Sequence, residues 1–255
     1  MLKAWIKYIT ALAYLPFCGK GRRVVLCYHS LKSDFTAGFR KQMEYIVCHC
    51  QVVKPSEILT VESDGRTIVA VTFDDAYVSF YENAVSVLTE LNMPAGVFVP
   101  TGFIGRQCNW QMPEGHPDKN EKVIDRQQIL GLEKHGIEVF SHTVSHPNLT
   151  KLSDEELKRE LIDSRIELED VLGHPVDIIS YPHGIYDRRV IDFAAAGGYR
   201  LGFTIEPRWV NDLENKLTLG RLVVSPKESL SIFKLKAAGA YAAENVLRNL
   251  KRRIR

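Results

Sequence analysis

The chain has 255 residues, of which 45% are hydrophobic and 25% charged, so it can bury a sizeable core and has the composition of a globular enzyme. Its net charge of +2 argues neither for nor against a nucleic-acid partner, and we expect no such partner. The cysteines exclude a structural zinc site built on two Cys pairs, because Cys48 and Cys50 have no second pair to join them. Free thiols favour a reducing compartment. We therefore expect a protein that is cytoplasmic or peripheral to the inner face of a membrane, with a periplasmic or exported protein as the alternative.

The chain opens with an apolar segment, residues 1–20, which we treat as separate from the domain that follows. Lys3 and Lys7 precede an apolar stretch at residues 8–17 that has the length of a signal-peptide core. No small-residue cleavage site follows this stretch, and it is too short to span a bilayer. We expect the segment either to lie on a membrane or to pack on the domain.

Short apolar runs and helical patterns alternate along residues 21–226, which we assign to one catalytic domain. The runs predict strands at residues 23–28, 67–73, 96–99, 137–140, 178–181, 201–204 and 222–224. The patterns predict helices at residues 39–50, 77–91, 126–134, 153–172 and 188–196. This alternation is typical of βαβ units and a parallel sheet. Because the chain has no Gly-rich phosphate loop, we favour a closed or nearly closed α/β barrel over an open dinucleotide-binding sheet.

Polar side chains end two of the predicted strands. Asp74 and Asp75 follow the run at residues 67–73, and His142 and His146 follow the run at residues 137–140. Each pair has an ordinary alternative, a helix cap for the carboxylates and a polar turn for the imidazoles. Together, two imidazoles and one carboxylate make an open site for zinc or a similar divalent metal, and the other carboxylate is free to act as a base. The pattern therefore predicts a metal-dependent hydrolase.

Two further segments stand outside the alternation. Residues 105–125 are polar and predict a loop on the face that carries function. Residues 227–255 form a basic helical pattern, which predicts either a solvated capping helix or attachment to an anionic membrane surface.

Three motifs resemble those of the polysaccharide deacetylases, a family of metal-dependent carbohydrate esterases that includes chitin and poly-N-acetylglucosamine deacetylases. They are Val-Thr-Phe-Asp-Asp at residues 71–75, Ser-His-Thr-Val-Ser-His-Pro at residues 141–147, and Tyr-Pro-His-Gly-Ile-Tyr-Asp at residues 181–187. Residues 94–102 and 220–222 are similar to flanking segments of the family's core. The resemblance runs from about Val24 to Val224 and implies a distorted (β/α)7 barrel, in agreement with the seven predicted strands.

The resemblance also implies roles for single residues. Asp75, His142 and His146 would hold one divalent metal, with zinc the first choice and nickel, cobalt or iron as alternatives. Asp74 would be the general base that activates water against an N-acetyl carbonyl. A backbone N–H near His183 would help to stabilise the oxyanion.

Departures from the family pattern bear on the base and on the acid. Ser180 stands where many members carry an arginine that orients the base, so Asp74 is expected to need another partner. The late histidine that often serves as general acid is absent, and the Tyr-His at residues 28–29 resembles the pair that supplies the acid in the poly-N-acetylglucosamine branch. We therefore expect His29 to be the general acid, with His183 as the other candidate and a simple strand-end hydrogen bond as the alternative role of His29.

Substrate contacts are predicted at Tyr181, Pro182 and His183 in the third motif, and at Trp110 in the polar loop. The predicted reaction is removal of N-acetyl groups from a sugar in a polysaccharide, an oligosaccharide or a lipid-linked precursor of a cell-surface glycan. The alternatives are O-deacetylation, hydrolysis of another amide at the same metal site, and an inactive glycan-binding scaffold.

Overall fold

The computed structural model describes residues 2–19, 21–211 and 215–245. It contains one parallel sheet, and the seven predicted strands are all present in it. They are β1 (Arg23–Tyr28), β3 (Thr67–Phe73), β4 (Ala95–Val99), β5 (Ile137–Ser141), β6 (Ile178–Ser180), β7 (Leu201–Phe203) and β8 (Leu222–Val223). An eighth strand, β2 (Cys50–Val52), was not predicted, because Cys50 was assigned to the end of the preceding helix and the polar Gln51 interrupts the apolar run.

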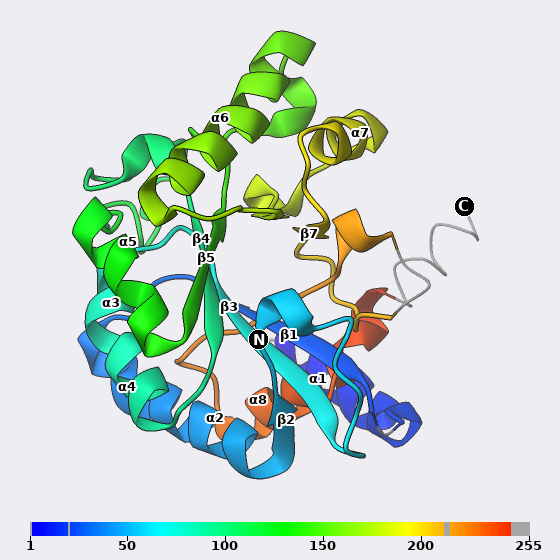
Figure 1. The fold of residues 1–255 in the computed structure, drawn as a ribbon. Coiled ribbons are helices and arrows are strands. Elements are labelled where there is room, and N and C mark those ends of the chain that lie inside the picture. Colours follow the sequence, from blue (N-terminus) through cyan, green and yellow to red (C-terminus); the bar gives the residue numbers. More distant parts are fainter. Residues whose placement is uncertain (1, 20, 212–214, 246–255) are drawn as a thin grey trace.

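The sheet curls into a nearly closed barrel (Figure 1). The strand order is β7-β6-β5-β4-β3-β1-β8, and β2 pairs with the first half of β3. Between the edge strands β7 and β8, the backbone of Leu219 bonds to the segment that contains β7. The amide of Leu219 donates to the carbonyl of Gly202, and the carbonyl of Leu219 accepts from the amide of Thr204. The predicted distorted (β/α)7 barrel is confirmed.

Helices cover the outside of the barrel (Figure 1). They are α1 (Leu2–Tyr14), α2 (Thr36–His49), α3 (Val78–Asn83), α4 (Val85–Glu90), α5 (Arg126–Leu132), α6 (Asp154–Leu172), α7 (Arg188–Ala196) and α8 (Leu230–Ala237). The single helix predicted at residues 77–91 is divided at Ala84 into α3 and α4. At the start of α6, Ser153 and Glu156 form a reciprocal capping box, and Gly173 ends the helix in the left-handed conformation.

Alternate residues of the strands face two different apolar cores. Val25, Ile68, Phe98 and Phe203 belong to a cluster inside the barrel. Their neighbours along the strands, such as Val24 and Val69, belong to the larger cluster that lies under the helices. Because both faces of the sheet are covered, the strands are apolar along their whole length and their polar residues lie at the ends.

The strand register brings the carboxyl ends together. Tyr28 of β1 pairs with Phe73 of β3, and Val99 of β4 pairs with Ser141 of β5. The amide of Asp74 then donates to the carbonyl of Tyr28 over 2.9 Å, which continues the pairing by one residue. The residues that follow β1, β3, β5 and β6 therefore meet at one rim of the barrel.

Candidate active site

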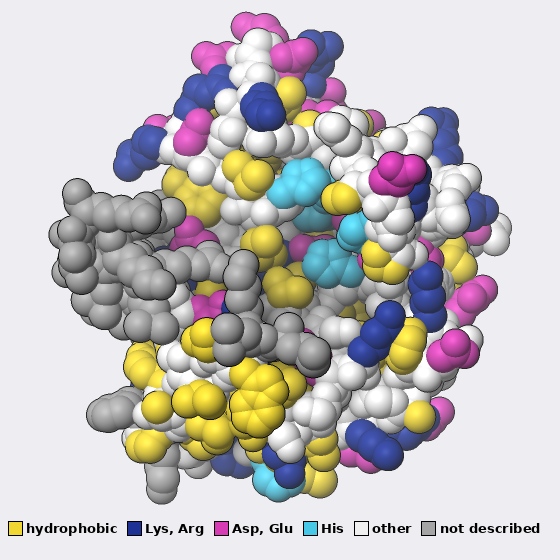
Figure 2. All heavy atoms as spheres, turned by 180° about the vertical axis from the view of Figure 1, so that it is seen from behind, with side chains coloured by type: hydrophobic (Ala, Val, Ile, Leu, Met, Phe, Trp, Pro, Cys, Tyr) yellow, Lys and Arg dark blue, Asp and Glu magenta, His cyan; other side chains and the backbone are white. Residues whose placement is uncertain are grey.

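The candidate site is a pocket of about 140 Å³ at this rim. Residues from several strand ends and from the polar loop line it: His29, Asp74, Asp75, Trp110, His142, His146 and His183. Figure 2 shows histidine side chains gathered in a hollow of the surface on this side of the molecule. Of the side chains that the sequence predicted for the site, the structure thus brings together all but two, which are considered below.

Asp75, His142 and His146 converge on one point. Their donor atoms lie within 4.8 Å of one another, and the three side chains are buried. Oδ1 of Asp75 lies 3.5 Å from Nε2 of His142 and 3.4 Å from Nε2 of His146, yet it accepts no hydrogen bond. Tetrahedral coordination with bonds of about 2.0–2.1 Å would separate two ligand atoms by about 3.4 Å. A buried, unpaired carboxylate oxygen at this spacing therefore fits a divalent cation.

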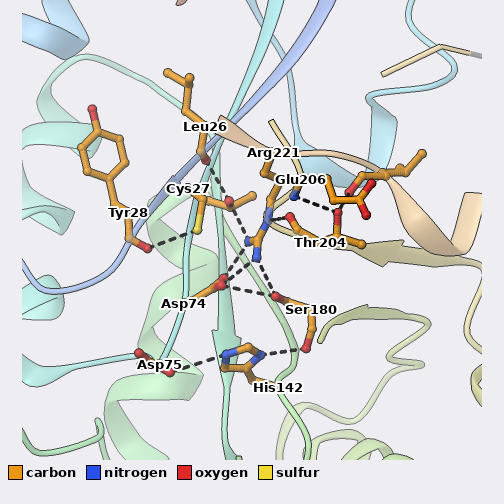
Figure 3. A network of polar contacts seen from close by, with 12 residues as sticks. Leu26, Cys27, Tyr28, Asp74, Asp75, His142, Ser180, Thr204, Glu206 and Arg221 are labelled. Atoms are coloured by element: carbon orange, nitrogen blue, oxygen red, sulfur yellow. Dashed lines mark hydrogen bonds and ion pairs between the residues drawn. The ribbon is translucent and has the colours of Figure 1, made fainter. Parts of the chain in front are cut away.

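The hydrogen bonds of the two imidazoles agree with this fit. Nδ1 of His142 lies 2.7 Å from the carbonyl oxygen of Ser180, which can only accept, so this nitrogen carries the proton and Nε2 presents its lone pair to the site (Figure 3). Burial lowers the pKa of His146 to about 3, which keeps that imidazole neutral. Burial alone would also lower the pKa of His142, but the negative charges of Asp74 and Asp75 raise it above its usual value. The negative charge of Asp75 thus lies between two imidazole nitrogens, an arrangement that favours a cation.

Asp74 points away from the three donors and pairs with Arg221 (Figure 3). Nη1 of Arg221 lies 2.7 Å from Oδ1 of Asp74, and Nη2 lies 2.6 Å from Oδ2. Arg221 also donates to Ser180 Oγ over 2.7 Å and to the carbonyl of Thr204 over 2.9 Å. Burial would raise the pKa of Asp74, but the charge of Arg221 and its hydrogen bonds hold it at about 2. Asp74 is thus a fixed, ionised carboxylate.

Arg221 is the partner that the sequence left open for the base. Ser180 stands where an orienting arginine was expected, and its small hydroxyl leaves room for Arg221 to reach Asp74 from the last strand. The guanidinium is fully buried and lies over the ring of Phe98, 5.2 Å from its centroid. The signals in the sequence were a charged residue inside the apolar run at residues 219–224 and the similarity of residues 220–222 to a flanking segment of the family's core.

The loop that carries the two histidines is held by Glu160 of α6, a second residue that the sequence analysis missed. Oε2 of Glu160 accepts from the backbone amides of Val144 and Ser145, each over 2.8 Å. The hydroxyl of Thr143 accepts from the amide of His146 over 3.2 Å. These bonds fix the turn between the two imidazoles.

Backbone strain is concentrated at the same rim. Among the described residues, six non-glycine residues have a positive φ, and one of them, Asn92, lies outside the site. The other five are Asp75, Ala76, Thr143, His146 and His183. At Ala76 φ is +49°, so the turn is left-handed in spite of the methyl group. Such conformations aim side chains into a site that regular strands cannot reach.

Both candidate acids line the pocket, from opposite sides. His29 follows β1 and lies beside Asp74, with which it shares a cluster of donor atoms within 4.8 Å. His183 lies beside His146, with ring centroids 4.6 Å apart, and burial together with the charge of His142 lowers its pKa. The amide of Gly184 donates to the carbonyl of Tyr181, which leaves the amide of His183 as the candidate oxyanion donor.

Trp110 forms one wall of the pocket. Its ring lies 4.8 Å from that of His146, 4.9 Å from that of Phe103 and, stacked, 6.1 Å from that of Tyr77. Gln111, Met112, Pro113 and His116 of the same loop also line the pocket, and none of them was predicted. The expectation that residues 105–125 form a loop on this face agrees with the structure.

Tyr181 and Pro182 are not where the sequence analysis placed them. Tyr181 is fully buried in an apolar cluster with Leu149 and Val190, and its ring stacks on that of Tyr186. Pro182 is also buried, and neither side chain lines the pocket. Ser180 faces inward to Asp74, so the alternation of extended residues turns its neighbour Tyr181 toward the helices. Pro182 lies beyond the strand, at the start of the short 3-10 helix Pro182–Gly184. The prediction that these two side chains bind substrate is corrected.

Known proteins are similar to this chain in both sequence and fold. The family model for polysaccharide deacetylases matches residues 62–202. The protein YxkH of Bacillus subtilis (strain 168), whose name places it among the polysaccharide deacetylases, is 30% identical over 93% of this chain and 79% of its own length. A poly-beta-1,6-N-acetyl-D-glucosamine N-deacetylase of Staphylococcus aureus is 24% identical over 73% of this chain and 66% of its own length. The structure of IcaB from Ammonifex degensii superimposes with a TM-score of 0.69 and 27% identity, over 87% of this chain and 98% of that one.

Proposed function

Because the chain belongs to the polysaccharide deacetylase family, we propose that it is a metal-dependent N-deacetylase of an N-acetylated sugar. One observation carries the proposal. A cation-binding triad, Asp75, His142 and His146, lies beside a separate carboxylate, Asp74, that Arg221 keeps ionised and fixed. Hydrolysis of an amide by water needs both elements, because the oxygen that holds a metal cannot also take the proton.

The donor set supports zinc as the metal. Two neutral imidazole nitrogens and one carboxylate oxygen are the ligands of many catalytic zinc sites, which keep one position open. Nickel, cobalt and iron accept the same donors, so the metal is a matter for experiment. When bound, the metal would polarise the acetyl carbonyl and acidify a water molecule, which a base as weak as Asp74 requires.

The side chains can then perform the hydrolysis in two steps. Asp74 takes a proton from water as the water oxygen adds to the acetyl carbon. The backbone amide of His183 stabilises the negative oxygen that forms on that carbon. His29 donates a proton to the nitrogen as the carbon–nitrogen bond breaks, which gives acetate and a free amine. An amine leaves poorly without this proton, and for that reason a general acid is part of the proposal.

A sugar is the substrate that the pocket and the relatives favour. The ring of Trp110 offers an apolar face of the kind that packs against the C–H surface of a pyranose. The Staphylococcus aureus relative is named for an N-acetylated glucosamine polymer. We therefore infer a substrate that contains N-acetylglucosamine or a close analogue.

The test is acetate release from N-acetylglucosamine oligosaccharides, with zinc, nickel or cobalt added to the purified protein. We expect acetate that depends on the metal, disappears with a chelator, and falls by about 10²–10⁴-fold in Asp74→Asn. Asp192→Asn, an exposed aspartate on α7, is the control and should be unaffected. Acetate release that Asp74→Asn leaves unchanged would refute the assignment of the base.

A further inference from the structure

Helix α1 carries an apolar face that no described part of the domain covers. Among the described residues, twelve large apolar side chains are exposed, and five of them follow one another on α1 and the turn after it. These five are Trp5 (64% exposed), Ile6 (54%), Ile9 (56%), Leu12 (43%) and Leu15 (37%). Trp5, Ile9 and Leu12 are spaced four and three residues apart, so they form one stripe along the helix. We call these five residues the α1 face.

The opposite side of α1 holds the helix on the domain. Ala11 is buried in the main core, and Tyr8 packs against that core. Nζ of Lys7 lies 2.8 Å from a carboxylate oxygen of Glu244. The helix is thus fixed through Tyr8 and Ala11, while Trp5, Ile6, Ile9 and Leu12 face outward, which differs from a helix that serves only the core.

Positive charge is concentrated in the two ends of the chain. Twelve of its 33 Lys and Arg residues lie in residues 1–22 and 227–255, against only two of its 31 acidic residues. The remaining residues 23–226 carry 21 basic and 29 acidic residues and are therefore negative. In the structure α1 packs against α8 and the turn at residues 240–242, so the described parts of these two ends form one surface. The exposed apolar side chains of α1, together with the positive charge that the sequence concentrates in these two ends, are complementary to an anionic bilayer.

A groove leads from this surface to the catalytic pocket. It has a volume of about 370 Å³ and borders α1 at Lys7. Six of its lining residues are apolar or aromatic: Ile205, Pro207, Leu222, Val223, Ile232 and Tyr241. The other four form two ion pairs, Lys7 with Glu244 and Lys236 with Glu228. Ile205 lines both this groove and the catalytic pocket, so an elongated ligand can occupy the two together. In Figure 2 apolar side chains gather at the lower left, where Figure 1 turned about the vertical axis places α1, and the histidines lie above them.

From these observations we infer that the α1 face docks the protein on an anionic lipid bilayer, and that the groove receives the lipid carrier of a membrane-anchored, N-acetylated saccharide. The docking is independent of the reaction, and the choice of substrate rests on the proposed function. A helix parallel to the bilayer places its Trp and Ile side chains at the boundary of the head groups. The groove then opens toward the lipid phase and the catalytic pocket toward the sugar.

Flotation with vesicles tests the docking. The full chain is mixed with vesicles of phosphatidylcholine alone and with an equimolar mixture of phosphatidylcholine and phosphatidylglycerol. We expect flotation with the mixture, weak flotation with phosphatidylcholine alone, and about tenfold or greater loss of binding in Ile9→Glu. Ile166→Glu is a matched control, because Ile166 on α6 and Ile9 are both 56% exposed. The control should float like the wild type.

Three outcomes would overturn the docking. The wild type stays with the soluble fraction, or Ile166→Glu loses as much binding as Ile9→Glu, or the lipid-free protein forms a dimer that Ile9→Glu dissociates. Circular dichroism and thermal unfolding of both variants establish that they are folded. A soluble oligosaccharide should be hydrolysed equally by the wild type and by Ile9→Glu, because Ile9 lies outside the catalytic pocket.

A second measurement tests the substrate. An N-acetylglucosaminyl lipid in the mixed vesicles is compared with a soluble N-acetylglucosamine oligosaccharide. We expect faster turnover of the lipid, and a loss of that advantage in Val223→Glu, which places a charge in the groove. Equal turnover of the two compounds would refute the lipid-carrier part. If neither is hydrolysed while the protein still floats, the proposed reaction is at fault and the docking stands.

Discussion

Arg221 and Asp74 form a two-point ion pair across the mouth of the barrel, between residues 147 positions apart in the chain. The pair joins the residue that precedes β8 to the end of β3, the strand that leads into both aspartates. Because neither side chain is exposed to more than a few per cent, solvent does not screen the pair. The same contact therefore contributes to the orientation of the base and to the closure of the fold.

Arg221→Met should lower both stability and activity. It leaves the carboxylate of Asp74 buried without a counter-charge, a change that typically costs about 3–5 kcal/mol. Urea unfolding measures this cost, and Arg200→Met is the control, because Arg200 pairs with Asp177 at the surface and should matter by less than about 1 kcal/mol. Without Arg221 the pKa of Asp74 rises, so the acid limb of the pH–rate profile should move to higher pH. An unchanged acid limb would show that the protonation of Asp74 does not determine this limb of the profile.

The contribution of Asp74 to stability should depend on pH in a defined direction. Its pKa is held at about 2 in the folded protein, below its value of about 3.9 in an unfolded chain. The stabilisation is therefore fully present above about pH 4 and is lost as the pH falls toward 2, with a total of about 2.6 kcal/mol. The difference in unfolding free energy between the wild type and Asp74→Asn should shrink over this range. A difference that grows as the pH falls would contradict the ion pair.

Removal of the metal should destabilise the protein as well as inactivate it. A cation at Asp75, His142 and His146 binds only the folded state, so zinc at about 100 times its dissociation constant would add about 2.7 kcal/mol. A chelator should lower the melting temperature of the wild type, and zinc should restore it. Asp75→Asn should melt at one temperature with or without the chelator. A metal-dependent melting temperature in this variant would place the cation elsewhere.

Two histidine variants separate the candidate acids. His29→Asn should slow the release of acetate from an N-acetyl sugar by about 10²–10⁴-fold, because the amine must be protonated as it leaves. The same variant should hydrolyse 4-nitrophenyl acetate at close to the wild-type rate, because nitrophenolate leaves without a proton. His183→Asn should not show this contrast between the two substrates. If it does and His29→Asn does not, the acid is His183.

Because Trp110 lines the pocket and Tyr181 does not, substitutions of these two residues should affect substrate binding differently. Trp110→Ala should raise the KM for an oligosaccharide several-fold, because the wall of the pocket loses its aromatic face. Tyr181→Phe should leave KM unchanged, because this side chain lies outside the pocket. The hydroxyl of Tyr181 is buried and has no hydrogen-bond partner, so its removal should not lower stability. A raised KM in Tyr181→Phe would restore this residue to the substrate-binding set.

The membrane hypothesis concerns the two ends of the chain, for which the sequence left two alternatives. Among the described residues, no helix combines the length and the apolar composition needed to cross a bilayer. The described half of the C-terminal pattern, α8 and the turn that follows it, packs into the core through Phe233 and Leu235. The last predicted part, residues 246–255, lies outside the described residues. The flotation experiment therefore bears mainly on α1.

The sequence by itself determined the strands, the long helices and the residues that meet at the rim. Periodicity found the strands because both faces of the sheet are buried, and a buried strand is an uninterrupted apolar run. The aspartate pair and the histidine pair were visible because each follows such a run directly, where no other element intervenes. Local order in the chain was enough for these features.

Only the tertiary structure decided which residues support the site and which way they face. Arg221 reaches Asp74 past one intervening strand, β1, from a position 147 residues further along the chain. Glu160 holds the histidine loop from a helix, so neither contact has a local signature in the sequence. Tyr181 belongs to a recognisable motif, yet the alternation set by Ser180 turns it into the core. Such contacts depend on how the sheet curls and on which element covers it, which are properties of packing between distant segments.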